Sequence, residues 1–226
     1  MPIRQAPITA TITPGLTAAF QRAISPERWR TYRFAAGFRE QKAQELYLWN
    51  AALGQSFHYP LQTVEVALRN VTHAALSAQY GADWCSDNAC RSMLGQRLGE
   101  DLDKADHRFQ KKYGVSPTTP QLLASLSLGF WVSLLRKPYQ TAIWTQHAKA
   151  AFPNLAPGQT INDVSQVGTA ILDLRNRIFH QEPLIGHNLS QDYGDILAML
   201  GWICTEMRDW VRQHSSVPRV IRERPR

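Results

Sequence analysis

Apolar residues recur at helical spacing along almost the whole chain, and no stretch reads convincingly as a β-strand. The clearest stripe belongs to the last predicted helix and consists of Tyr193, Ile196, Leu197, Leu200, Ile203, Met207, Trp210 and Val211. A stripe of this width is typical of a helix that packs one face against a core. Eight or so such segments in one chain predict an all-α bundle.

Capping residues, prolines and glycines mark where these helices begin and end. The predicted helices are residues 14–24, which Thr13 caps; 26–53, with Gly37 as a candidate break; 61–80; 88–113; 119–135; 138–152; 162–180; and a last one that Ser190 caps. Gly54 and Pro60 are interpreted as bracketing a turn. The helix before Pro183 is expected to stop near His180, because the residue before a proline is disfavoured in the helical region.

The length of 226 residues suits one large domain better than two small ones, and a hydrophobic content of 44% is enough for a sizeable core. We expect an N-terminal extension over residues 1–24, a single helical domain over 25–214 and a basic, disordered tail over 215–226. Lys and Arg number 25 against 18 Asp and Glu, which gives a charge of +7. This balance favours anionic partners, nucleic acid first.

Nothing in the sequence addresses the chain to a membrane. Residues 1–13 lack the apolar stretch of a secretory signal. The uncharged segment 116–135 has an apolar part of only 14 residues, 122–135, whereas a spanning helix needs about 20. Three cysteines, Cys85, Cys90 and Cys204, are too few for a disulfide scaffold and suit a reducing compartment. We therefore expect a cytoplasmic protein.

Several common chemistries have no motif here. The chain contains no glycine-rich phosphate loop, no Cys-x-x-Cys pair and no His-Glu-x-x-His. Cys85 and Cys90 have a spacing that fits no common zinc site, so we expect neither a metal nor a cofactor. A Ser/His/Asp triad is not excluded, but no nucleophile-elbow glycines support it.

The strongest candidate is the hexapeptide Arg175 to His180, with the sequence Arg-Asn-Arg-Ile-Phe-His. The guanidinium of Arg175 matches phosphate oxygens with a planar fork of donors. Histidine exchanges a proton near neutral pH, so His180 can act as acid or base. Because the 2′-hydroxyl of RNA is an internal nucleophile, a base, an acid and a charge stabiliser suffice for cleavage without a metal.

Two considerations weigh against a catalytic site formed by Arg175 and His180 of one chain. Positions five apart in an ideal helix differ by about 140° in azimuth and roughly 7.5 Å along the axis, so Arg175 and His180 do not share a face. Either the helix ends at the histidine or two copies complete one site across a dimer. An arginine and a histidine near a helix C-terminus also complement the helix dipole and need no function.

The motif and its neighbours resemble the HEPN ribonucleases, whose signature is R-x4-6-H with a polar residue, here Asn176, often following the arginine. The wider pattern is similar to the Abi-like, abortive-infection branch of the AbiD/AbiF type and covers roughly residues 25 to 212. The stretches that carry it are Ser25-Pro26-Glu27-Arg28 with Tyr32, Leu46 to Asn50, Glu65 to Asn70, Tyr80 to Trp84, Ser127 to Trp131 and the helix from Tyr193 to Trp210. No single stretch is specific, and the resemblance depends on their order and spacing together.

This resemblance implies a HEPN-type helical bundle with additional N-terminal helices and a metal-independent endoribonuclease activity. It implies that His180 is the general acid or base, that Arg175 stabilises the pentacoordinate phosphate and that Asn176 orients one of these groups. Two copies would form a homodimer with a composite cleft for RNA. The family is associated with phage defence and toxin-like growth arrest, so an antitoxin or a phage-derived trigger is a further expected partner.

Other polar residues form a weaker set of candidates. Glu65, Arg69 and Asn70 precede His73 on one predicted helix, and Leu68-Arg69-Asn70 echoes Leu174-Arg175-Asn176. We favour a bracing Glu65–Arg69 ion pair over a catalytic role, because the two residues have the i, i+4 spacing of helical ion pairs.

His187, in the loop after the motif, and Tyr193 are supporting candidates for the site. For Tyr193 we favour a place in the core over a catalytic role, and the Phe130-Trp131 pair is likewise expected to pack in the core. Exposed aromatic rings would instead give bases a stacking platform. The alternative function for the whole chain is a helical module that binds RNA or a phage protein without cutting.

Overall fold

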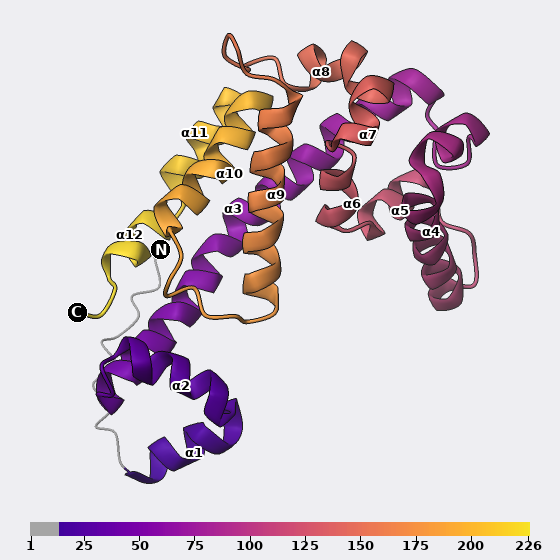
Figure 1. Cartoon of the computed structure of the whole chain (residues 1–226). Helices are drawn as coiled ribbons and strands as arrows, with labels where there is room; N and C mark the ends of the chain where they lie inside the picture. Colours follow the sequence, from indigo (N-terminus) through magenta and orange to yellow (C-terminus); the bar gives the residue numbers. More distant parts are fainter. Residues whose placement is uncertain (1–13) are drawn as a thin grey trace.

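The computed structural model describes residues 14–226, and these contain helices and no β-strand (Figure 1). The predicted all-α class is therefore confirmed. In chain order the elements are α1 (Pro14–Ile24), α2 (Pro26–Ala35), α3 (Glu40–Tyr80), α4 (Asn88–Tyr113), α5 (Thr119–Ser125), α6 (Leu128–Ser133), α7 (Lys137–Tyr139), the π-helical turn η1 (Gln140–Trp144), α8 (Thr145–Ala151), α9 (Ile161–Phe179), α10 (Leu189–Ile203), α11 (Thr205–His214) and α12 (Val217–Arg222). The predicted cap Thr13 lies outside the described residues.

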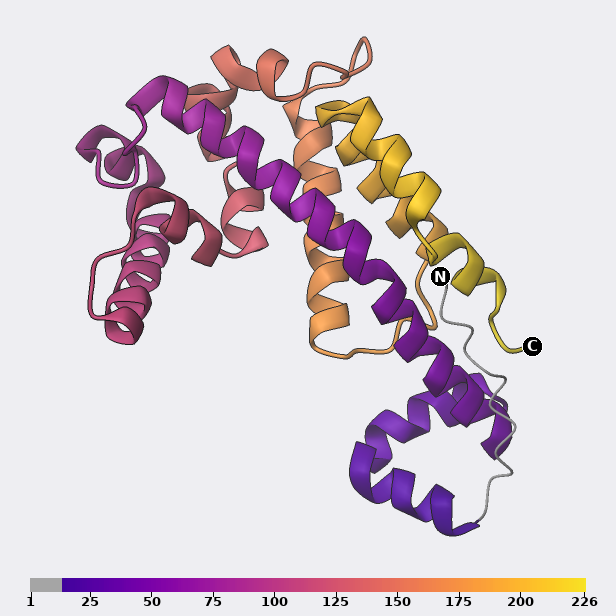
Figure 2. The same ribbon diagram turned by 180° about the vertical axis from the view of Figure 1, so that it is seen from behind.

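Helix α3 is the spine of the molecule. Figure 2 shows it crossing the whole structure, with α1 and α2 at one end and α4 near the other. The predicted turn between Gly54 and Pro60 is wrong, because α3 is a single helix of 41 residues with Pro60 buried inside it. The buried residues Leu53, Phe57, Leu61, Val64 and Leu68 form one stripe that passes through the proline without a change of spacing. Packing on both sides of Pro60 therefore outweighs the hydrogen bond that proline cannot donate.

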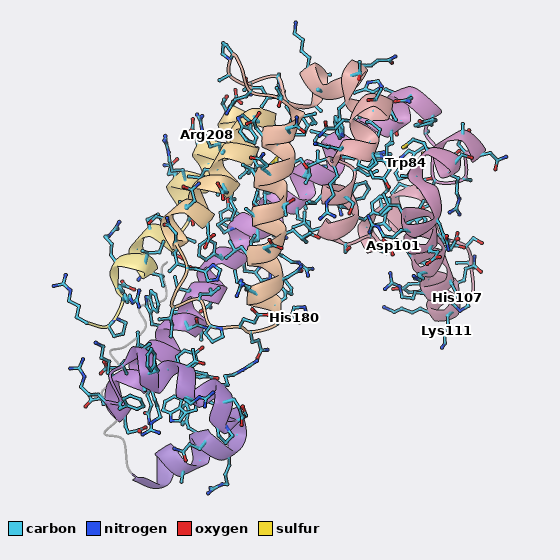
Figure 3. All side chains as sticks on the ribbon, in the orientation of Figure 1. Trp84, Asp101, His107, Lys111, His180 and Arg208 are labelled. Atoms are coloured by element: carbon cyan, nitrogen blue, oxygen red, sulfur yellow. The ribbon has the colours of Figure 1, made fainter. Side chains whose placement is uncertain are left out.

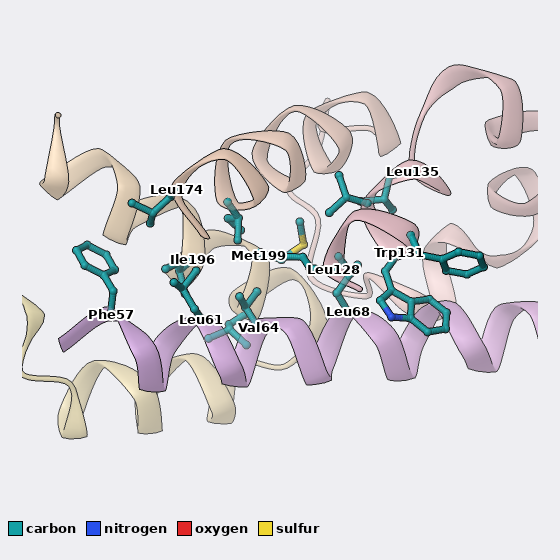
Figure 4. Packing of buried hydrophobic residues seen from close by; sticks show 14 of the residues in the cluster. Phe57, Leu61, Val64, Leu68, Leu128, Trp131, Leu135, Leu174, Ile196 and Met199 are labelled. Atoms are coloured by element: carbon teal, nitrogen blue, oxygen red, sulfur yellow. The ribbon is translucent and has the colours of Figure 1, made fainter. Parts of the chain in front are cut away.

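The core forms where α3 meets α6, α9 and α10. Figure 4 shows Phe57, Leu61, Val64 and Leu68 of α3 facing side chains of these helices. Leu174, Ile196, Met199, Leu128, Trp131 and Leu135 complete this part of the buried cluster. Phe130 and Trp131 are 1% and 0% exposed, so their predicted packing role is confirmed and they offer no stacking platform.

The N-terminal helices join the bundle through aromatic rings. Ser25 caps α2, its hydroxyl accepting the backbone N–H of Arg28, and Gly37 has a φ of 60° in the turn that ends this segment. The predicted break at Gly37 is thus confirmed. Phe20 of α1 lies 5.3 Å from the ring of Trp29 and 5.6 Å from that of Tyr47. The described part of the expected extension is therefore packed against α2 and α3.

Three segments that the pattern predicted as single helices are divided. Helix α4 is kinked at Gly95, whose φ of 69° and ψ of −179° are not helical. The uncharged stretch breaks at Leu126 and Ser127, which separate α5 from α6. The last stripe breaks at Cys204, whose backbone is extended between α10 and α11. Asn188, rather than Ser190, caps α10 by accepting the N–H of Gln191. None of the helices in the described range 14–226 has the length and apolar content needed to span a membrane.

The expectation that residues 215–226 are disordered is wrong. Val217 and Val220 of α12 are 0% and 5% exposed, and the indole N–H of Trp49 donates to the carbonyl of Val220 at 2.7 Å. Arginine-rich composition suggested a solvated tail, but an apolar pair at i, i+3 gives this segment a buried face.

Candidate functional site

The end of α9 sets the position of His180. Thr160 and Asp163 form a capping box at the start of this helix, and His180 is its C-cap. The next two residues close a Schellman turn: the N–H of Gln181 donates to the carbonyl of Ile178 at 3.0 Å, and the N–H of Glu182 to that of Arg177 at 2.8 Å. The predicted stop near His180 is confirmed, and this turn ends the helix before Pro183 is reached.

Arg175 lies between a carboxylate and an aromatic ring. Its Nε is 4.0 Å from Oε2 of Glu65 on α3, and its guanidinium carbon is 4.1 Å from the centre of the Phe179 ring. The Arg175 side chain keeps 26% of its exposure, while Phe179 is 53% exposed. Within residues 14–226, Nε of Arg175 has no hydrogen-bond partner. A stacked guanidinium at the surface is oriented without being sealed from a phosphate.

His180 is exposed at the free end of α9, on the side of the molecule that holds α1 and α2 (Figure 3). Its backbone N–H donates to the carbonyl of Asn176, one turn earlier, at 2.8 Å. Asn176, which is half-buried, and His180 lie on the same side of α9, since positions four apart differ by about 40° in azimuth. Arg175 points toward α3 instead. Among the described residues, no hydrogen bond joins Arg175 to His180.

The prediction of a Glu65–Arg69 ion pair is wrong, because Glu65 on α3 faces Arg175 on α9 instead. Arg69 is half-buried and Asn70 exposed further along α3. The described chain shows no ion pair or hydrogen bond between these two side chains and the residues of the α9 motif. They therefore form no part of the cluster around Arg175.

The two supporting candidates after the motif, His187 and Tyr193, are held by contacts with neighbouring residues. Nδ1 of His187 lies 3.6 Å from Oδ2 of Asp192, and its backbone N–H donates to the carbonyl of Leu184. Burial raises the pKa of Asp192, and the nearby His187 opposes this rise. Tyr193 is 7% exposed and meets the Phe57 ring edge-on at 6.4 Å, so its predicted place in the core is confirmed.

A second histidine near the motif, His58, was not predicted. This exposed residue of α3 has its ring 6.3 Å from that of Phe179. It precedes Glu65 by seven positions, a spacing that places both on one face of a helix. That spacing was the available sequence signal, and the predicted turn at Pro60 concealed it.

In the described part of the chain, no group of three or more His, Cys, Asp or Glu side chains is arranged to hold a metal ion. No protein-family model, curated protein or solved structure matches this sequence or fold. The end of α9 thus presents an exposed imidazole, a guanidinium stacked on an aromatic ring, and an amide. These groups can exchange a proton, carry a positive charge and form hydrogen bonds.

Proposed function

We propose that the protein is a metal-independent endoribonuclease of the HEPN superfamily, of the Abi-like kind, that acts in phage defence or as a toxin. The observation that supports this most is the end of α9. The Schellman turn holds His180 exposed at the C-cap, while Phe179 and Glu65 orient the guanidinium of Arg175 at the surface. The formal charge of +7 is consistent with RNA as the partner.

The proposed reaction is attack of the ribose 2′-oxygen on the adjacent phosphorus. An imidazole accepts the 2′-hydroxyl proton as the P–O2′ bond forms. The P–O5′ bond breaks, and an imidazolium gives the leaving 5′-oxygen its proton. The products are a 2′,3′-cyclic phosphate and a 5′-hydroxyl. Arg175 stabilises the charge on the pentacoordinate phosphate, and Asn176 orients the phosphate or the histidine.

The azimuth of the two side chains favours a site shared between two copies. Within one chain Arg175 points toward α3 and His180 points outward, so they approach a phosphate from different sides of α9. A second copy related by a two-fold axis brings a second Arg175 and a second His180 to the same groove. One histidine then serves as base and the other as acid.

The test is cleavage of total RNA in EDTA by His180→Ala and Arg175→Ala. We expect each variant to lose at least about 100-fold in rate, because general acid–base and charge-stabilising groups each contribute on that scale. Matched controls are His107→Ala and Arg97→Ala, which remove the same residue types from exposed positions on α4, far from the motif (Figure 3). Both controls should cut normally and leave cyclic phosphate ends.

Unchanged cleavage by His180→Ala would refute the assignment. RNA binding by a wild-type protein that does not cut, surviving His180→Ala and weakening steeply with salt, would indicate the non-catalytic module instead. Sedimentation at the assay concentration checks the composite groove, since a fully active monomer contradicts a site built from two copies.

A further inference from the structure

A cavity of about 270 Å³ lies directly beside the α9 motif, between α2, α3 and the loop that follows α9. Gln181 and Glu182, the two residues after His180, form one side of it. Tyr47, Asn50 and Gln55 of α3 are among the other lining residues. The cavity therefore adjoins the proposed reaction site without containing Arg175 or His180.

The lining combines an aromatic surface with amide groups. Asn50, Gln55 and Gln181 each carry both a donor and an acceptor, as needed to read the edge of a heterocycle. Oδ1 of Asn50 accepts the N–H of Leu184 at 2.6 Å, which fixes this amide and points its donor group elsewhere. Tyr47 supplies an aromatic ring, and aromatic rings stack on nucleobases.

The lining of the cavity also includes a positively charged side chain. Arg28 of α2 reaches its edge, and within residues 14–226 no carboxylate lies within ion-pair distance of it. Tyr32 lines the same wall, and burial raises its pKa to about 12, so its hydroxyl stays protonated at neutral pH. A guanidinium beside a half-enclosed cavity that is lined by apolar side chains, aromatic rings and a few amides suits a ligand that joins a planar ring to a phosphate.

Size limits what the cavity can take. Pockets for small molecules usually measure roughly 300–1,000 Å³, so this cavity of about 270 Å³ falls just below that range and suits one ring system, not several nucleotides. Its wall is also shaped by an unusual backbone. Gln181 has a φ of 57°, a conformation that side-chain-bearing residues rarely adopt and that helix ends normally give to glycine. This places an exposed amide at the rim where a glycine would leave none.

We propose that this cavity is the base-recognition subsite of the enzyme: it binds the nucleobase of the RNA residue next to the scissile phosphate, with Arg28 on the backbone phosphate. This inference rests on the proposed function for its substrate. Since sequence-specific recognition of RNA works mainly through unstacked bases in pockets, the subsite makes cleavage base-selective.

The direct test measures binding of the four nucleoside 3′-monophosphates and inorganic phosphate to the full-length His180→Ala protein. Ala51, an exposed residue of α3, lines the cavity, so Ala51→Trp fills it from a surface position. Ala150→Trp, at an exposed position of α8, is the matched control. We expect at least one nucleotide to bind about tenfold tighter than phosphate, with that difference lost in Ala51→Trp and kept in Ala150→Trp. Equal binding of all probes, or binding that Ala51→Trp leaves unchanged, overturns the subsite.

A second variant guards against misfolding. Gln181→Gly removes the rim amide and places glycine in a backbone conformation that glycine prefers, so the fold is retained. In an otherwise wild-type enzyme it should change the ratio of kcat/KM between RNAs that differ in the flanking base by about tenfold. An active Ala51→Trp enzyme with unaltered base preference disproves the subsite and leaves the ribonuclease standing. Nucleotide binding that Ala51→Trp abolishes, in a protein whose wild type cuts no RNA, disproves the ribonuclease and leaves the subsite standing.

Discussion

Two histidines of this chain, His73 and His180, occupy opposite environments: the first is half-buried and hydrogen-bonded, and the second is exposed. His180 is exposed at the end of α9, where it is the C-cap residue. His73 of α3 is half-buried, and its Nδ1 accepts the indole N–H of Trp84 at 3.0 Å. Burial lowers the pKa of His73 below its ordinary value of 6.5. Because Nδ1 can accept this hydrogen bond only while it carries no proton, the neutral form of His73 stabilises the position of Trp84.

The His73 environment predicts an acid-sensitive fold. Because the folded pKa lies below 6.5, the unfolded chain binds the proton more readily, so stability is full above 6.5 and is lost as the pH falls through the folded value. We expect the free energy of unfolding, measured with urea, to decline as the pH falls below 6.5. His73→Asn should flatten this decline, whereas His107→Asn, at an exposed site on α4, should not. Equal slopes in wild type and His73→Asn would remove His73 as the cause.

Arg175, Asn176 and His180 could be identified from the sequence as candidate site residues because they lie within one hexapeptide. The sequence does not predict the partner of Arg175. Glu65 was paired with Arg69 by helical spacing, yet the packing of α3 against α9 turns its carboxylate toward Arg175. A contact between helices more than 100 residues apart in sequence has no local pattern, so only the fold reveals it.

Among the helices, those with clear terminal signals were predicted closely. Helix α4 begins at Asn88 after the cap Asp87 and ends at Tyr113 before Gly114, which has the left-handed φ of 73° expected of a stop. Helix α3 was divided in error because Gly54 and Pro60 are breakers only when packing permits. Its buried stripe continues through both residues, so tertiary contacts decided the outcome.

Glycines inside helices provide a test of that packing. A methyl group added at Gly54 would lie 3.6 Å from Cγ2 of Ile178, an ordinary contact, whereas one at Gly168 would lie 3.0 Å from Cδ1 of buried Leu135. Gly54→Ala should therefore raise the free energy of unfolding by about 0.5–1 kcal/mol, the usual gain in helix propensity. Gly168→Ala should lower it by about 1 kcal/mol or more, since overpacking outweighs that gain.

Chemical denaturation of the two variants beside wild type checks this pair. The substitutions are the same and both lie inside helices, so a difference in sign reports only the space around each glycine. Stabilisation by Gly168→Ala would show that Leu135 moves aside easily and that the junction of α6 and α9 is loosely packed.

For the whole molecule, the spine α3 brings together parts that no motif connects. The proposed base subsite draws Arg28 from α2, Asn50 from α3 and Gln181 from the loop after α9. Arg28 and Asn50 lie in stretches that carry the family resemblance, but the sequence marks neither of them nor Gln181 as a site residue, because amides and single arginines are common on helix surfaces. The motif was thus predictable as a local pattern, while its surroundings depend on which helices α3 holds side by side.

The C-terminal helix α12 is also held in place by α3. Trp49 of α3 is 5% exposed, its indole N–H donates to the carbonyl of Val220, and Arg224 lies over its ring at 5.3 Å. Composition predicted a solvated tail because four of the last eight residues are arginines. The structure shows that α12 covers α3 close to the wall of the proposed subsite, since Asn50 is the residue after Trp49.

Removal of residues 217–226 should therefore destabilise the fold. Full burial of a valine contributes about 1.5–3 kcal/mol, so loss of the two buried valines of α12 is expected to cost on the order of 3–6 kcal/mol. Urea unfolding of the truncated chain measures it. Removal of Pro225 and Arg226 alone is the control and should change stability by no more than about 0.5 kcal/mol. Equal stability of the two truncated chains would mean that α12 does not hold Trp49 in solution, because a docked helix with two buried valines cannot be lost without cost.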